Sequence, residues 1–219
     1  IFPRFHQLDV VRKLLADVAR NGAGKRYLVQ HSAGSGKSLS IAWTAHQLVG
    51  LKPEGAPSAP DVFDSVIVVT DRRVLDKQIR NTIKQFAHVG STVGAVTKGA
   101  KQLRRFIEQG KKIIISTIQK FPYILDEIGN EHRDHRFAIL IDEAHSSQGG
   151  KTTAAMSEAL SKAGGDPEDT INQALEKRMR ARKLVDNASY FAFTATPKNK
   201  TLELFGTPEP QPVGTVKHR

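Results

Sequence analysis

Residues 34–38 have the composition and order of a loop that binds phosphate. The run reads GSGKS; it follows an apolar stretch at residues 27–30 and precedes a helical pattern at residues 41–48. Glycines let successive backbone N–H groups turn inward around a β-phosphate, and the helix N-terminus adds positive potential. Lys37 can reach the β and γ phosphate oxygens, and Ser38 can ligate Mg²⁺. We therefore predict a site for ATP with Mg²⁺, formed by Gly34, Ser35, Gly36, Lys37 and Ser38.

The match to the general phosphate-loop pattern is imperfect. The strict pattern has a further glycine where this chain has His31, so a glycine-rich turn without function is the alternative interpretation. The lysine argues against that alternative, because a cation in the first turn of a helix opposes the helix dipole unless an anion is present.

Two adjacent carboxylates follow the apolar run at residues 137–141. Asp142 is placed to hold Mg²⁺, usually through water in such sites, and Glu143 to orient or deprotonate the water that attacks the γ-phosphate. An acidic cap at a helix start is the alternative interpretation of this pair. Combined with the phosphate loop, the pair predicts ATP hydrolysis with Lys37, Asp142 and Glu143 as the catalytic residues.

Hydroxyl side chains end the last apolar run, at residues 190–194. We predict that Thr194 and Thr196 couple the phosphate site to the rest of the protein. The partners of these hydroxyls would be Asp142, His145 or a relay to the γ-phosphate. From the letters alone, the segment is equally a strand end followed by a turn.

Gln7 precedes a helical pattern at residues 8–18. Its amide can pair with both the amino group and N7 of adenine, a combination that no other base edge offers. In isolation, a glutamine at this position is ordinary surface. Gln7 is therefore a predicted adenine-binding residue only in combination with the phosphate loop.

Apolar runs alternate with helical patterns along the chain. Helical periodicity occurs at residues 8–18 and 74–86. The alternation predicts an α/β fold, in which helices cover a mainly parallel sheet and ligands bind beyond the carboxyl ends of the strands. Five runs are apolar on both faces, as buried parallel strands are: residues 27–30, 66–70, 112–117, 137–142 and 190–194.

Polar and proline-rich segments suggest the limits of the domain. We expect loops at residues 52–61, 145–153 and 163–169, and a helical insertion over residues 151–186. Prolines at residues 206–213 argue against regular structure there, so this segment is expected to be an exit strand or linker. We predict one lobe over residues 1–206 and an exit segment over residues 207–219.

The overall composition favours a globular protein with polyanionic partners. The 219 residues carry a formal net charge of +11 and include no cysteine, so no disulfide framework is possible. No apolar run approaches the roughly 20 residues of a membrane helix. The first residues lack an initiator Met and the layout of a signal peptide, so we expect a piece of a longer, cytoplasmic protein.

The motifs together resemble the first lobe of superfamily two helicases and translocases. The resemblance rests, in order, on residues 4–7, 34–38, 142–145 and 194–197. Residues 30–38, 69–75, 116–121 and 194–197 resemble, more specifically, the motor subunit of type I restriction endonucleases, a family that commonly carries histidine at the position of His31.

The resemblance implies a RecA-like, three-layer P-loop NTPase lobe that uses ATP and Mg²⁺. It implies that Arg4, in addition to Gln7, is a nucleotide-binding residue. It also implies a second RecA-like lobe and a nuclease domain in the parent chain, and assembly with modification and specificity subunits. None of these other parts is recognisable in this sequence.

Two further motifs are identified by the resemblance as DNA contacts. The first follows the strand at residues 66–70 and the second ends the strand at residues 112–117, and a solvated polar turn is the alternative for each. The basic stretch at residues 177–183 is a weaker candidate for the same role. The residues assigned to DNA are Arg72, Arg73, Thr117, Gln119 and Lys120.

The function implied by the resemblance is ATP-driven translocation of double-stranded DNA without strand opening. We expect this piece to bind ATP but to hydrolyse it poorly, because a second lobe normally supplies arginines worth about 10³ to 10⁵ in turnover. A DEAH-type RNA or repair helicase and a binding module switched by nucleotide remain alternatives. A P-loop kinase is disfavoured, because no phosphoacceptor site or lid is evident.

Overall fold

The computed structural model describes residues 3–32, 34–70, 93–96, 100–117, 124, 127–128, 132–142, 187–197, 202, 208–210 and 216–218. The chain forms two compact units, Ile1–Ala144 with Val185–Thr196 and His145–Leu184 with Pro197–Arg219. The first unit contains all the described residues of the predicted site. Pro197, the last residue of the motif at residues 194–197, belongs to the second unit.

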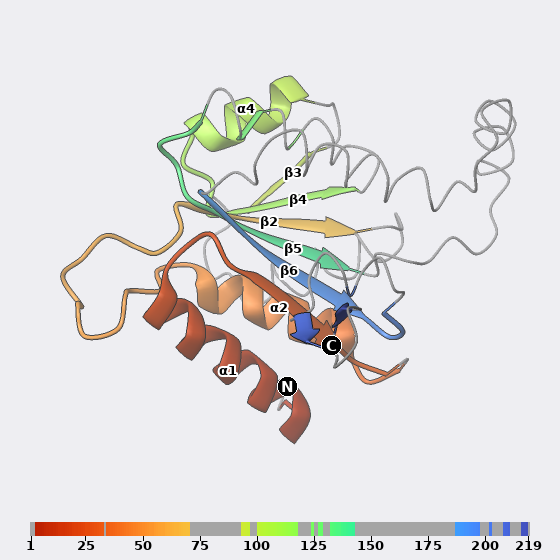
Figure 1. The fold of residues 1–219 in the computed structure, drawn as a ribbon. Coiled ribbons are helices and arrows are strands. Elements are labelled where there is room, and N and C mark those ends of the chain that lie inside the picture. The colour runs from red at the N-terminus through yellow and green to blue at the C-terminus, as the bar shows by residue number, and fades with distance from the viewer. Residues whose placement is uncertain are drawn as a thin grey trace, which may run out of the picture. The chain divides into compact units, whose positions relative to one another are not determined.

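A parallel sheet of six strands lies at the centre of the first unit, and its arrowheads point the same way in Figure 1. The strand order is β1-β6-β5-β2-β4-β3, and neighbouring strands pair in parallel throughout. The carboxyl ends of the strands therefore share one edge, called the carboxyl edge below. The strands are β1 (Arg26–Gln30), β2 (Ser65–Thr70), β3 (Val93–Ala95), β4 (Ile113–Thr117), β5 (Phe137–Asp142) and β6 (Ala188–Thr194).

The sequence predictions of an α/β fold and of five of these strands are confirmed. Every residue of β2, β5 and β6 is buried, as expected for strands with apolar side chains on both faces. The strand that the sequence did not indicate is β3, which has the sequence VGA and lacks an apolar run. Its Gly94 lies so close to the ring of Phe106 that a Cβ would stand 2.8 Å from that ring.

Helices α1 (Phe5–Asn21) and α2 (Lys37–Leu48) lie side by side along one region of the sheet (Figure 1), and α2 contacts both β2 and β5. Helix α1 buries Val11, Leu14 and Val18, which recur at helical spacing on one side. Helix α4 (Ala100–Glu108) lies near β3 and β4 in Figure 1.

The helices predicted near residues 8–18 and 41–48 are confirmed, and each begins earlier than its apolar pattern. The loop expected at residues 52–61 is also confirmed, since it contains turns and no strand or helix. The helical pattern at residues 74–86, the loops at 145–153 and 163–169, and nearly all of the insertion at 151–186 lie outside the described residues.

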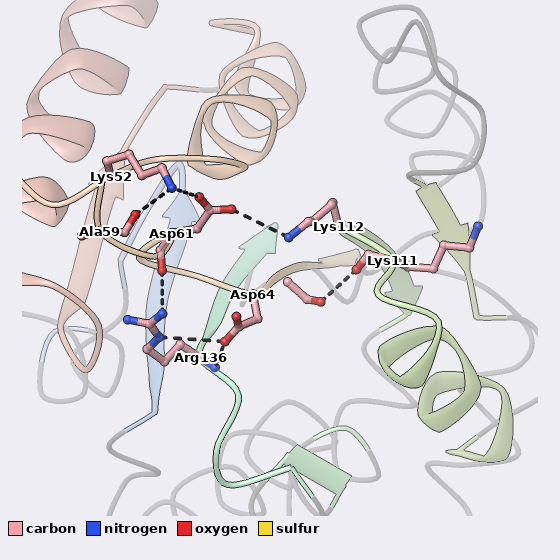
Figure 2. A network of polar contacts seen from close by, with 8 residues as sticks. Lys52, Ala59, Asp61, Asp64, Lys111, Lys112 and Arg136 are labelled. Atoms are coloured by element: carbon pink, nitrogen blue, oxygen red, sulfur yellow. Dashed lines mark hydrogen bonds and ion pairs between the residues drawn. The ribbon is translucent and has the colours of Figure 1, made fainter. Parts of the chain in front are cut away.

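The amino ends of three strands are joined by a network of charged side chains, shown in Figure 2. Lys52 Nζ lies 2.9 Å from Asp61 Oδ1, and Lys112 Nζ lies 3.8 Å from Asp61 Oδ2. The hydrogen bond from Lys52 is the main reason that the pKa of Asp61 lies below its usual value. Arg136 donates a 2.7 Å hydrogen bond to the Asp61 carbonyl, and its backbone N–H donates one of 2.7 Å to Asp64. These contacts connect the segments that lead into β2, β4 and β5.

The second unit contains a two-stranded antiparallel sheet, formed by β7 (Pro208–Pro210) and β8 (Val216–His218). The expectation that residues 206–213 lack regular structure is therefore wrong for β7. Both strands of a two-stranded sheet are edge strands. An edge strand tolerates proline, because the backbone N–H that proline lacks can be one that would face solvent. The predicted lobe boundary at residue 206 stays a prediction. Among the described residues, no helix is long and apolar enough to cross a membrane.

Candidate nucleotide-binding site

The loop between β1 and α2 has the backbone conformation that its glycines permit. The N–H of His31 donates a 2.8 Å hydrogen bond to the Thr194 carbonyl, which extends the pairing of β1 with β6. Gly34 and Gly36 then have φ angles of 75° and 84°, in the left-handed region that favours glycine. Gly36 is the N-cap of α2, so Lys37 is the first residue of that helix.

Side chains at the start of α1 hold this loop from one side. The amide of Gln7 donates hydrogen bonds of 3.2 and 3.0 Å to the carbonyls of Ser35 and Gly36. Its oxygen accepts a 2.9 Å bond from the backbone N–H of Arg4. His6 Nε2 lies 3.1 Å from the Ser35 carbonyl. Gln7 is buried, and a Cβ on Gly36 would collide with its nitrogen.

These contacts orient the peptide groups of the loop. In a trans peptide the C=O and the following N–H point in opposite directions. Because the carbonyls of Ser35 and Gly36 face Gln7, the N–H groups of Gly36 and Lys37 point away from α1. Inward-pointing N–H groups at a helix N-terminus are the arrangement that binds phosphate.

Asp142 lies at the same edge of the sheet as the loop. It is the last residue of β5, is 3% exposed, and pairs in register with Phe193 of β6. The next residue of β6, Thr194, pairs with Gln30 at the end of β1. Only β6 separates β1 from β5, so the two strand ends are about 10 Å apart. A magnesium triphosphate is long enough to contact both.

The remaining predicted nucleotide and coupling residues differ in position. Thr194 is buried at the end of β6, between the strand that carries the loop and the strand that carries Asp142. Ser38 lies half-buried in the first turn of α2, and Thr196 is exposed just beyond β6. Glu143 and His145 lie outside the described residues.

The predicted DNA motifs begin at neighbouring strand ends. Thr70 of β2 pairs with Thr117 of β4, so the described residues of both motifs lie at the carboxyl edge. Of the residues assigned to DNA, only Thr117 is described, and it is half-buried. The others, Arg72, Arg73, Gln119 and Lys120, lie outside the described residues.

A pair of imidazole rings beside the loop was not predicted as a unit. The ring centroids of His6 and His31 are 5.4 Å apart, with an angle of 78° between the planes. Burial, followed by the charges of His6 and Lys37, lowers the pKa of His31. In the sequence, His31 departs from the general glycine pattern and matches the type I restriction family, but neither signal indicates its contact with His6, which depends on the packing of α1.

The chain is similar to an ATPase family and to subunits of type I restriction enzymes. Residues 6–165 match the family model for the SWI2/SNF2 ATPase. The HindI type I restriction enzyme endonuclease subunit of Haemophilus influenzae is 29% identical over 189 residues, covering 80% of this chain and 16% of that protein. The SsaAORF53P subunit of Staphylococcus saprophyticus is 23% identical over 196 residues, covering 88% of this chain. The chain spans 17% of that second relative, so the resemblance to these subunits is confirmed for a small part of their length.

Solved structures share the fold. The Hef helicase domain of Pyrococcus furiosus matches 92% of this chain with a TM-score of 0.55 and 16% identity, over 35% of that structure. A nuclease-deletion mutant of the Type ISP restriction-modification enzyme LlaGI, in complex with a DNA substrate mimic, matches 90% of this chain with a TM-score of 0.55 and 16% identity, over 18% of its length. The predicted RecA-like architecture is therefore confirmed.

Proposed function

The chain belongs to the SWI2/SNF2 ATPase family, and from this premise we propose that it is the ATP-hydrolysing lobe of a motor that moves double-stranded DNA in a type I restriction complex. One observation supports the proposal above the others. The loop that carries Lys37 and the carboxylate of Asp142 lie at the same edge of one parallel sheet, with a single strand between them.

The proposed catalytic roles follow from this placement. Lys37 neutralises the β and γ phosphate oxygens, and the N–H groups at the start of α2 bind the phosphate that the loop surrounds. Glu143, the next residue after Asp142, orients the attacking water or accepts its proton. Arg4 and Gln7 hold the nucleoside end from α1, and pairing of Gln7 with adenine N7 requires its amide to exchange a bond to the Ser35 or Gly36 carbonyl for one to the base.

The donor groups at this edge fit Mg²⁺. Ser38 and Asp142 offer oxygen ligands, which Mg²⁺ prefers, and one or two protein oxygens suffice because phosphates and water complete its coordination. The described residues contain no group of three or more His, Cys, Asp or Glu that would hold a metal alone, and a Mg²⁺–nucleotide site needs none. Ser38 and Asp142 would hold the ion, which would supply positive charge against the charge that develops on the transferred phosphate.

Coupling and DNA contact are assigned to neighbouring parts of the same edge. Thr194 ends the strand between the loop and Asp142, which suits a hydroxyl that responds to the γ-phosphate together with Thr196 and His145. Beyond β5, the segments that follow β2 and β4 supply the proposed DNA contacts. Duplex DNA, the second lobe, the nuclease domain and the partner subunits are proposed by analogy with relatives that are several times longer. The net charge of +11 is consistent with a polyanionic track.

Salt dependence of duplex binding tests the DNA assignment. Each phosphate neutralised by a lysine or arginine contributes about −0.9 to the slope of log affinity against log salt. We expect Arg72→Ala and Arg73→Ala each to reduce the magnitude of that slope by about one, in titrations of a labelled duplex from low to moderate salt.

The matched control is Lys13→Ala, an exposed lysine paired with Asp9 on α1, which should leave the slope unchanged. Tighter binding of single-stranded RNA than of duplex DNA would favour an RNA helicase. Unchanged slopes in both arginine variants would remove these residues from the DNA contact.

A further inference from the structure

His31 is a buried titratable residue that the proposed mechanism does not use. It is the first residue after β1 and is 8% exposed. Its backbone N–H is bonded to Thr194. Its ring nitrogen Nδ1 is buried and forms no hydrogen bond with the described part of the chain. A buried nitrogen of this kind carries a cost unless a partner arrives.

The charged and titratable groups around His31 come from two helices. From α1, His6 places its ring edge-on against that of His31, while its own Nε2 contacts the Ser35 carbonyl. From α2, the positive charge of the Lys37 ammonium group lowers the pKa of His31. Strand β6 contributes Thr194, which does not titrate, and Asp142 lies one strand further away on β5.

These surroundings disfavour a charged imidazole while the loop holds no anion. Burial is the largest cause of the low pKa of His31, followed by His6 and Lys37. A polyphosphate beside Lys37 changes the effect of the nearby charges on the pKa of His31 from lowering to raising it, because the negative charges of the polyphosphate exceed the single positive charge of the lysine. An opposite charge within about 4 to 6 Å favours the charged form of a titratable group.

We propose that His31 takes up a proton when a nucleotide polyphosphate enters the loop, so that the loop holds its ligand with two cations, Lys37 and the imidazolium of His31. The inference rests on the proposed function and deepens it. Where other phosphate loops have glycine, this chain has a residue that couples nucleotide binding to pH.

The direction of the pH effect follows from linkage. The pKa of His31 is lower in the free protein than in the complex, so binding takes up protons between these two values. Nucleotide affinity therefore rises as pH falls through the pKa of the complex, and becomes constant below the pKa of the free protein. Between these two pKa values, the increase in nucleotide affinity approaches tenfold for each unit by which the pH falls.

Calorimetric titration with ADP and Mg²⁺ measures this uptake directly. In buffers of different ionisation enthalpy, the slope of the observed enthalpy gives the number of protons bound per ADP. Protonation of ADP itself is common to all variants, so the difference between the wild type and His31→Asn isolates His31. We expect the wild type to take up more protons than the variant, by up to about one per ADP near neutral pH.

His46→Asn is the matched control, because His46 lies in the last turn of α2, at the other end of that helix from the loop. It should show wild-type uptake. Equal uptake by the wild type and His31→Asn would overturn this inference alone. If the wild type binds no ADP, the proposed function fails and this inference fails with it.

A second measurement does not depend on a variant that folds. The ¹⁵N chemical shifts of the histidine rings report directly on protonation in the wild-type chain. We expect the His31 signals to move from neutral to imidazolium values on addition of ADP and Mg²⁺ near neutral pH. Neutral His31 signals in the ADP complex across the range from pH 6 to 8, about the usual histidine range, would refute the inference.

Discussion

Lys37→Ala is expected to weaken the binding of ADP or ATP by roughly 30-fold to 5,000-fold. Removing one partner of a close, partly desolvated charge pair typically costs about 2 to 5 kcal/mol. In this chain the loss falls on a phosphate that the loop also contacts through backbone N–H groups. Calorimetric or fluorescence titration with the magnesium nucleotide measures the change.

Lys13→Ala serves as the control for this substitution. The Lys13 side chain is 75% exposed and pairs with Asp9 one turn earlier in α1, so its removal should leave nucleotide affinity within experimental error. An unchanged affinity in a folded Lys37→Ala variant would mean that the loop is the glycine-rich turn without function.

Glu143→Gln is expected to lower the rate of ATP hydrolysis by about 10² to 10⁴ while ATP remains bound. General acid–base catalysis typically contributes this factor, and glutamine retains the size of the side chain but cannot accept a proton. Steady-state phosphate release measures the rate, and retention of labelled ATP on a filter measures the trapped complex.

Glu108→Gln, at the exposed end of α4, is the matched substitution and should leave hydrolysis unchanged. If Glu143→Gln leaves turnover as it is in the wild type, the nucleotide acts as a switch for a binding module and Glu143 is not the base.

The sheet was predictable because burial on both faces leaves a local trace. Strands such as β2 and β5 consist mainly of valine and isoleucine or other apolar residues, and such runs have few alternatives to a central parallel strand. Strand β3 leaves no such trace. Its Gly94 is required by the approach of Phe106, a contact set by packing and not by the local sequence. Strand β7 was expected only as one of two options, an exit strand or a linker, because prolines argue against regular structure but are compatible with an edge strand.

The edge that carries the site was predictable, but the contacts that shape it were not. Motifs that directly follow buried strands must meet at the carboxyl edge of a parallel sheet, and Lys37 and Asp142 do so. In contrast, the bonds from Gln7 to the loop carbonyls join residues 28 and 29 positions apart. They depend on how α1 packs against α2. From the sequence alone, the Gln7 amide was assigned only to adenine.

A structure of this chain with ADP, Mg²⁺ and a γ-phosphate analogue would show whether the loop and Asp142 share one magnesium nucleotide. We expect one magnesium ion between the Ser38 hydroxyl and the Asp142 carboxylate, with water between Asp142 and the metal. We also expect a hydrogen bond from Lys37 Nζ to the phosphate analogue. Phosphates bound away from the loop, or a metal that neither Ser38 nor Asp142 approaches, would contradict the proposed function.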